Sequence, residues 1–272
     1  MFGLFPKNNH ESESHALFFQ QTEQAAQAEG KSAYFRLHRS RFAAILAALK
    51  GTPPGTKVLE IGVTPGQCTR LLVKAGYQVS GLDLNPASRQ ELWTQLGIDV
   101  RQANLERESL PFPSATFEWV IFSEVLEHLV FSPLPVLREF QRVLRPGGKI
   151  LLTTPNELYF KSRLQALGRL LCWQSLLSAA EFQHQMRLEG EARYTTHSRL
   201  YTLAELCWTI EQAGFKIQQK EYVAAWERVG LGEKGRWKSQ PLRVLAKSLL
   251  ATLTKMLPQT RSMLLVVGEK IS

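Results

Sequence analysis

The stretch KVLEIGVTPGQCTRLL (57–72) decides the fold of this chain. It opens with a short apolar strand over 57–62, and a turn bounded by two glycines then leads into a helical stretch over 67–75. Strand and helix signals go on alternating, with strands at 77–83, 99–103, 117–123 and 149–154 and helices at 86–96 and 134–144. This alternation predicts an α/β fold with a doubly wound, mostly parallel sheet, whose ligands bind beyond the carboxyl ends of the strands.

The segments around this core break the alternation. We divide the chain into an N-terminal arm and helix (1–50), a binding core (51–156), a helical lid insertion (157–200), a continuation of the core (201–223), a basic helical insertion (224–261) and a closing strand (262–272). Within the first segment, residues 1–30 are polar with little periodicity and predict a loosely ordered arm, whereas 34–49 predicts a helix. Thr202 and Glu205 fit a capping box at the start of a helix over 202–213.

Composition excludes several classes of protein. Of 272 residues, 44% are hydrophobic and 21% charged, as in a globular protein. Three cysteines without metal-ligand spacing argue against a disulfide framework and for a reducing compartment. The start lacks the pattern of a signal peptide, and no apolar run is long enough to span a bilayer. We therefore expect a cytoplasmic protein.

The net charge of +9 lies mainly in the flanks, at 31–50 and 228–261. In the second of these regions, 241–257 repeats leucine at helical spacing beside Arg243, Lys247 and Lys255, with Trp237 nearby. A basic amphipathic helix of this kind can dock on an anionic membrane surface. The same stripe can also pack on the sheet edge or on a second subunit.

The glycine turn and one carboxylate together predict nucleoside binding. Gly62 and Gly66 allow a close backbone approach to a ligand. Asp83 ends the second strand 21 residues after Gly62, the spacing that lets a carboxylate accept hydrogen bonds from ribose hydroxyls. A dinucleotide fingerprint would need glycines where Thr64 and Gln67 stand, so pyrophosphate binding is poorly supported.

Four blocks in this order, VLEIGVTPGQCTRLL (58–72), VSGLDLNP (79–86), LPFPSATFEWVIFSEVLEHL (110–129) and VLRPGGKILLTTPN (143–156), resemble the class I S-adenosylmethionine-dependent methyltransferases. The resemblance implies a seven-stranded Rossmann-like sheet whose last strand is antiparallel, with S-adenosylmethionine as cofactor. It also implies that Glu60, Gly62, Thr64 and Gly66 border the methionine part, Asp83 the ribose, Asn104 and Leu105 the adenine, and Ser123 the sulfonium. Leu84, next to Asp83, is a further cofactor-binding candidate. The chain departs from the family at Thr64, where a glycine is usual, and at Asn104, where an aspartate is usual.

Glu124, Glu127 and His128 follow the fourth strand at i, i+3 and i+4, which on a helix puts all three on one face. Such a face can hold a general base or bind a hard divalent metal. The small-RNA 3′-end methyltransferases and some quinone O-methyltransferases use a similar Glu-x-x-Glu-His with a metal. We predict no metal here, and we take His128 and Glu124 as candidate catalytic residues.

The stretch HSRLYT (197–202) resembles a motif of bacterial methyltransferases that act on small molecules or lipid-linked saccharides. The resemblance makes His197 a third catalytic candidate and Arg199 and Tyr201 substrate-binding candidates, all at the pocket mouth if 157–200 is a lid. A purely structural role for His197 remains open.

We therefore predict a methyltransferase that methylates oxygen on a small or lipid-linked acceptor. One alternative is a metal-dependent RNA 2′-O-methyltransferase, although basic residues are not interleaved with aromatic ones as in a single-strand binder, so no nucleic-acid partner is expected. The other is a catalytically inactive, membrane-associated nucleoside-binding module.

Overall fold

Seven strands form one sheet in the computed structural model, which describes residues 9–176, 179–187, 194–227 and 241–271. The strands are β1 (Lys57–Ile61), β2 (Gln78–Asp83), β3 (Asp99–Gln102), β4 (Phe117–Ser123), β5 (Leu144–Pro155), β6 (Phe215–Val223) and β7 (Met263–Lys270). Their order is β3-β2-β1-β4-β5-β7-β6, and only β7 is antiparallel to its neighbours. This confirms the doubly wound sheet with an antiparallel last strand.

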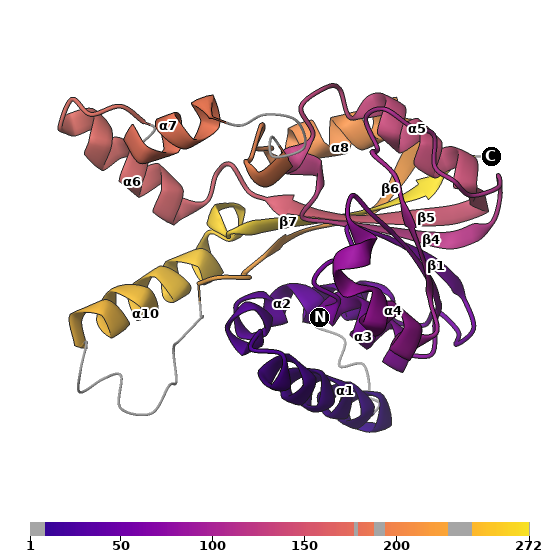
Figure 1. Cartoon of the computed structure of the whole chain (residues 1–272). Helices are drawn as coiled ribbons and strands as arrows, with labels where there is room; N and C mark the ends of the chain where they lie inside the picture. Colours follow the sequence, from indigo (N-terminus) through magenta and orange to yellow (C-terminus); the bar gives the residue numbers. More distant parts are fainter. Residues whose placement is uncertain (1–8, 177–178, 188–193, 228–240, 272) are drawn as a thin grey trace, which may run out of the picture.

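Helices cover both faces of the sheet (Figure 1). One face carries α2 (Ser32–Ala48), α3 (Gln67–Lys74) and α4 (Gln90–Leu96), and the other carries α5 (Leu134–Val143) and α8 (Leu203–Gln212). Alternate side chains of β4 supply the two cores, because Phe122 packs with Phe140 on the α5 side while Ile121 packs with Phe42 on the α2 side. The predicted capping box at Thr202 is present at the start of α8.

Residues 9–30 of the N-terminal arm, the part of it that the structure describes, are mostly helical, contrary to the sequence-based expectation. Residues Asn9–Ala28 form a helix, α1, which packs on α2 and α3. Phe19, Thr22 and Ala26 are buried at spacings of three and four, so one face of the helix is covered although the segment is polar overall. Glu29, just beyond α1, pairs with Arg70 and Arg89 of the core. Packing against the core orders a segment whose own periodicity is weak.

Two predicted elements have different bounds. The predicted helix over 86–96 opens as a 3₁₀ turn, η1 (Pro86–Arg89), before α4. The fifth strand begins at Leu144 instead of 149, since Leu144 pairs with Phe117 and the register then shifts so that Lys149 pairs with Trp119. The Pro-Gly-Gly turn at 146–148 therefore lies inside β5.

The helical insertions leave the sheet at one edge. The first, with α6 (Phe160–Leu171) and α7 (Ala179–Met186), follows the carboxyl end of β5, and the second, with α10 (Pro241–Met256) and the turn η4 (Pro258–Thr260), precedes β7. Met263 of β7 pairs with Pro155 of β5 and with Val223 of β6, so the first insertion begins, and the second both begins and ends, at the same end of the sheet. Residues 228–240 of the predicted basic insertion, including Arg236, Trp237 and Lys238, lie outside the described residues.

Asn156 ties the bases of these insertions together. Its side-chain amide donates to the carbonyls of Gln259 and Arg261, at 2.9 and 2.6 Å. Its backbone forms an isolated bridge with Tyr201, where the first insertion returns to the core.

Candidate functional site

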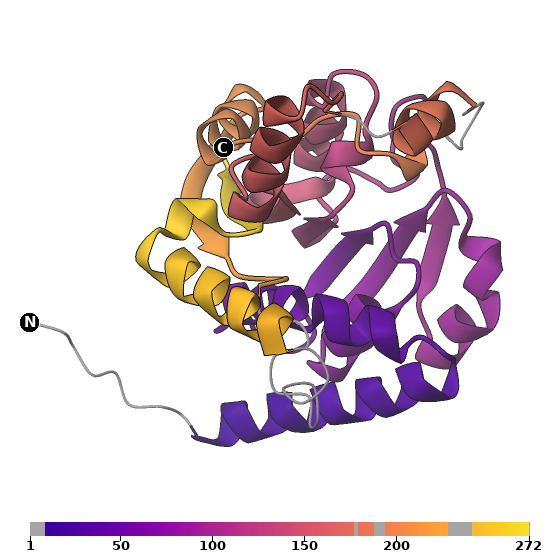
Figure 2. The ribbon, with the colours of Figure 1, turned by 90° about the vertical axis from the view of Figure 1, so that its left-hand side faces the viewer.

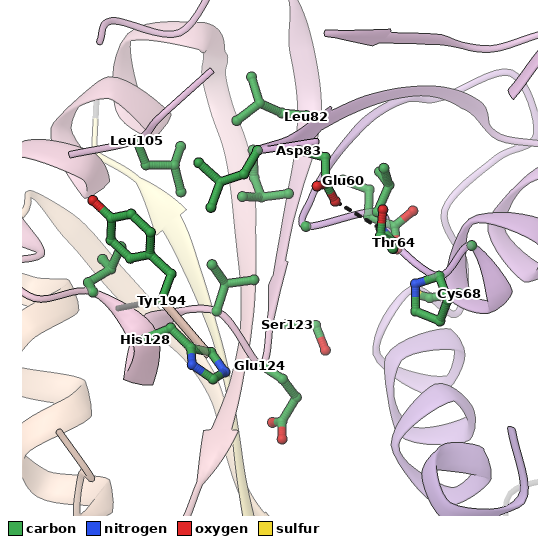
Figure 3. Close-up of a pocket in the computed structure, with 18 of the residues that line it drawn as sticks. Glu60, Thr64, Cys68, Leu82, Asp83, Leu105, Ser123, Glu124, His128 and Tyr194 are labelled. Atoms are coloured by element: carbon green, nitrogen blue, oxygen red, sulfur yellow. Dashed lines mark hydrogen bonds between the residues drawn. The ribbon is translucent and has the colours of Figure 1, made fainter. Parts of the chain in front are cut away.

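A cavity of about 540 Å³ lies at the carboxyl ends of β1, β2 and β4 (Figure 3). Its wall is completed by α2 and by residues 194–195 of the first insertion. Every residue predicted to border the cofactor lines it, namely Glu60, Gly62, Thr64, Gly66, Asp83, Leu84, Asn104, Leu105 and Ser123. The predicted position, beyond the strand ends, is therefore where the cavity lies, while the role of each residue stays a prediction.

The turn after β1 needs its two glycines. Gly62 and Gly66 have φ of 74° and 97°, a backbone conformation that L side chains rarely adopt. A Cβ on Gly62 would also lie 2.7 Å from Cγ2 of Val125. A Cβ on Gly66 would clash with Cδ2 of buried Leu92, so the two glycines let the turn pack closely against Val125 on one side and Leu92 on the other.

Asp83 anchors the same turn. One carboxylate oxygen accepts the backbone N–H of Thr64 at 3.0 Å (Figure 3). The other accepts the backbone N–H of Asn85, also at 3.0 Å. Each oxygen keeps lone pairs beyond the single bond it accepts, so the carboxylate can still accept hydrogen bonds from a ligand in the cavity.

At the other end of the cavity, Asn104 is buried and its amide donates to the hydroxyl of Tyr194 at 3.2 Å. Tyr194 comes from the returning end of the first insertion and was not found from the sequence, because no local pattern indicates that this segment crosses the cavity. Asn104 also accepts the N–H of Glu106 at 3.0 Å, which fixes its amide.

Sequence reasoning also missed a buried arginine. Arg41 of α2 reaches into the cavity, where its guanidinium donates to the hydroxyl of Tyr34 at 3.1 Å and lies 3.7 Å from a carboxylate oxygen of Glu124. Its Nε has no hydrogen-bond partner among the described residues. A usable signal existed, because Tyr34, His38, Arg41 and Ile45 form one stripe at helical spacing, and a charge inside such a stripe is costly unless it has a partner.

Glu60 provides an opposite charge in the same wall. Burial raises its pKa to about 7, and its Oε2 has no partner in the described part of the chain. Arg41 is thus a buried cation and Glu60 a buried acid, and each keeps one polar atom without a hydrogen-bond partner among the described residues. Such a pair fits a ligand group with a negative and a positive charge, such as the carboxylate and ammonium of a free amino acid.

The segment after β4 does not form the predicted helix face. Glu124 has a φ of 55°, and only Leu126–His128 form a 3₁₀ turn, η2. As a result, Glu124 accepts a hydrogen bond from Thr153 inside the cavity wall, whereas Glu127 turns into the core and accepts one from Thr154 at 3.0 Å. The expectation of a shared face for Glu124, Glu127 and His128 is wrong, because the positive φ at Glu124 ends any helical continuation.

A different trio lies together beside the cavity. Glu127, His128 and His197 bring one potential ligand atom each within 4.8 Å of one another. The two imidazole rings meet edge to face with centroids 4.8 Å apart. Oε1 of Glu127 has no hydrogen-bond partner among the described residues and lies 4.0 Å from Nε2 of His128.

The protonation of the trio follows from burial. Burial lowers the pKa of His128 and raises that of Glu127. Nδ1 of His128 is 3.0 Å from the carbonyl of Thr196, and a carbonyl can only accept, so the neutral ring carries its proton there and leaves Nε2 as a base. This arrangement can take a proton from a substrate, and its three atoms have the spacing of a divalent-metal site.

The predicted substrate residues do not line the cavity. Tyr201 is buried in the core on the α5 side, so its expected position at the pocket mouth is wrong. Arg199 is exposed, and its backbone N–H donates to the carbonyl of Glu127 at 3.3 Å. His197 does not line the cavity either, but its ring packs against His128, which does.

Comparison with known proteins gives consistent matches. The profile of the family described as "Methyltransferase domain" matches residues 33–220, more than half of the chain. A protein of Mycolicibacterium smegmatis named "Probable S-adenosylmethionine-dependent methyltransferase" is 36% identical over 180 residues, which are 66% of this chain and 58% of that protein. A ubiquinone biosynthesis O-methyltransferase of Xanthomonas campestris is 32% identical over 120 residues, 42% of this chain and 49% of that protein. The chain spans about half the length of the curated relatives it matches.

Among solved structures, phosphoethanolamine N-methyltransferase 2 of Haemonchus contortus, in complex with phosphomonomethylethanolamine and S-adenosylhomocysteine, superposes with a TM-score of 0.58. The identity is 17%, and the match covers 93% of this chain and 60% of that one. At this identity the likeness concerns the fold alone.

Proposed function

Because this chain belongs to the class I S-adenosylmethionine-dependent methyltransferases, we propose that it methylates a hydroxyl oxygen on a small or lipid-linked acceptor. The observation that carries the choice of oxygen is the free Nε2 of His128 at the cavity wall, because a hydroxyl must lose its proton when it is methylated. The ubiquinone biosynthesis O-methyltransferases among its relatives support a hydroxyl acceptor.

Different residues of the cavity bind different parts of the cofactor. Asp83 accepts hydrogen bonds from the ribose, and Asn104 and Leu105 hold the adenine. Arg41 and Glu60 face the carboxylate and ammonium of the methionine part, which accounts for their unsatisfied atoms. When bound, S-adenosylmethionine supplies a methyl group on a positively charged sulfur, next to Ser123 and Glu124.

His128 acts as the general base and Glu127 supports it. As His128 takes the acceptor proton, its ring becomes positively charged, and this charge favours ionisation of Glu127, 4.0 Å away, whose pKa burial otherwise raises; the carboxylate so formed stabilises the ring. His197 packs against the same ring and restricts its orientation. Alignment of the acceptor with the methyl group supplies the rest of the rate.

A transfer assay with labelled S-adenosylmethionine tests the proposal. With crude lipid, quinone and RNA fractions as acceptors, we expect label in the lipid or quinone fraction. His128→Gln should lower kcat by about 10²- to 10⁴-fold, the usual contribution of a general base, and leave the Kd of the cofactor unchanged. His184→Gln, on exposed α7, is the matched control. Full activity of His128→Gln would refute the role of the base, and label in RNA alone would refute the acceptor class.

The trio Glu127, His128 and His197 favours a second candidate, a metal-dependent RNA 2′-O-methyltransferase. The two imidazole nitrogens and the carboxylate oxygen fit a divalent metal in chemistry and spacing, and the metal would polarise the acceptor oxygen. Activity on RNA that is abolished by a chelator and restored by Mg²⁺ or Mn²⁺ would select this candidate. Full activity in chelator would select the metal-free base. Calorimetry that detects no cofactor binding would leave only an inactive module.

A lipid-linked acceptor also implies where the enzyme works. Within the described ranges, no helix combines the length and the hydropathy that crossing a bilayer requires. We therefore propose a cytoplasmic enzyme that contacts the anionic inner membrane surface peripherally. Cell fractionation tests this, with recovery in the membrane fraction and release by high salt as the expected result.

A further inference from the structure

An apolar surface gathers on the two helical insertions. Nineteen large apolar side chains are exposed in the described part of the chain; eight of them lie within 164–186 and four within 245–257. Helix α6 has no buried residue at all. In Figure 1, α6, α7 and α10 project from the same end of the molecule, and Figure 2 looks onto that end.

Each insertion contributes a leucine stripe at helical spacing. On α6, Leu164, Leu167 and Leu171 follow at i, i+3 and i+7, with exposed fractions of 57%, 50% and 73%. On α10, Leu245 and Leu249 follow at i and i+4, and both side chains are exposed. The sheet therefore does not cover these two positions of the stripe predicted from the sequence. The side chain of Leu242, at the start of the predicted stripe, lies outside the described residues.

Trp173 adds an exposed aromatic ring to this surface. It follows α6 and is 97% exposed. Tryptophan is enriched at the level of lipid headgroups, where its ring is apolar and its N–H is hydrated. A fully exposed tryptophan beside a leucine stripe has the composition of an interfacial anchor.

The charge of the surface selects the partner. From 157 to 187 the chain carries four Lys or Arg residues and two acids, of which Glu157 pairs with Arg163, and from 241 to 262 it carries four Lys or Arg residues and no acid. A second copy of this chain would bring the same positive charge against it, whereas anionic headgroups would neutralise it. We infer that α6, Trp173 and α10 form one docking surface for an anionic lipid bilayer.

The fold places this surface at the same end of the sheet as the cavity, the end where the carboxyl ends of the parallel strands lie. The first insertion leaves the sheet at Pro155 and the second returns to it at Met263, the residue paired with Pro155, and Asn156 links their bases. The cavity opens at the carboxyl ends of β1, β2 and β4, which lie at this end. Docking therefore keeps the cavity next to the bilayer, and an acceptor held in that bilayer reaches it without leaving the membrane. This last step rests on the proposed function; the docking itself does not.

Vesicle co-sedimentation of the full chain, without cofactor or acceptor, tests the docking. We expect pelleting with vesicles of equal parts phosphatidylcholine and phosphatidylglycerol, none with pure phosphatidylcholine, and release by high salt. The pairs Leu167→Glu with Leu171→Glu on α6 and Leu245→Glu with Leu249→Glu on α10 should each lower the partition coefficient at least about tenfold. Each pair replaces apolar contacts with the bilayer by negative charges that the anionic headgroups repel.

Two controls and one test of the charge accompany these variants. Trp208→Glu, an exposed aromatic position on α8, should bind the vesicles nearly as well as the wild type. Replacing Lys161 and Lys255 by Gln should weaken binding about fivefold per lysine. Unchanged affinity for S-adenosylhomocysteine shows that each variant is folded.

Two results would overturn the inference. One is equal pelleting with both kinds of vesicle at low salt. The other is a dimer, measured by light scattering, that the α6 and α10 variants convert to a monomer while their vesicle binding stays unchanged. Because no methyl transfer is measured, failure of the docking and failure of the proposed activity are distinguishable.

Discussion

Replacing Asp83 by alanine should weaken cofactor binding without unfolding the protein. The carboxylate accepts one backbone N–H on each oxygen, from Thr64 and Asn85, and keeps further lone pairs for ribose hydroxyls. A hydrogen bond to a charged group contributes about 1.5–3 kcal/mol, so losing this acceptor should raise the Kd by about 10- to 150-fold. The two backbone N–H groups lie in an exposed turn and can bind water instead, so the stability of the fold should change little.

Isothermal titration calorimetry with S-adenosylmethionine measures this effect. Asp83→Asn keeps one acceptor oxygen and loses the charge, so its Kd should lie between those of the wild type and Asp83→Ala. Asp99→Ala is the matched control, because Asp99 is an exposed carboxylate at the start of β3, paired with Arg101 and outside the cavity wall. An unchanged Kd for folded Asp83→Ala, or an equal loss in Asp99→Ala, would refute the assignment.

Three further predictions concern stability. In the folded protein the pKa of Glu60 is about 7, above its unfolded value, so the stability that the protonated side chain contributes is fully present at low pH and is lost as the pH rises through 7. The free energy of unfolding of Glu60→Gln in urea should therefore match that of the wild type at pH 5 and exceed it at pH 8 by on the order of 3 kcal/mol. The same difference at both pH values would contradict this. Gly62→Ala should destabilise the fold by about 1–3 kcal/mol through its positive φ and the contact with Val125, and Val125→Ala should relieve only the contact; full rescue would show that the φ costs nothing. Thr202→Ala should cost about 1 kcal/mol through loss of the capping box, and an unchanged melting temperature would argue against the cap.

The features predictable from the sequence are those set by local pattern. The strands of the sheet follow from short apolar runs, and the turn at Gly62 and the acid at Asp83 follow from fixed spacings along adjacent strands. Thr202 begins its helix as predicted, because a capping box depends only on the residues from Thr202 to Glu205 and not on distant parts of the chain.

The features that were missed depend on contacts between distant segments. Arg41 counts in the sequence as one of several surface cations, and only the docking of α2 on the sheet makes it a buried cavity residue. The direction of Glu124 depends on one backbone angle that residue spacing does not reveal. Tyr201 was assigned to the pocket mouth by its motif, but hydrophobic burial places it in the core.

The position of Arg41 in the cavity wall also links folding to binding. The wall is built from two parts of the chain, the sheet and a helix that precedes it, so a ligand that contacts both stabilises their association. Local opening of α1 and α2 should therefore be rarer in the ligand-bound protein than in the free protein. Bound ligand should then protect these helices from proteases that cleave there. A chain shortened to begin at residue 51 would keep all seven strands and still lack one side of its binding site.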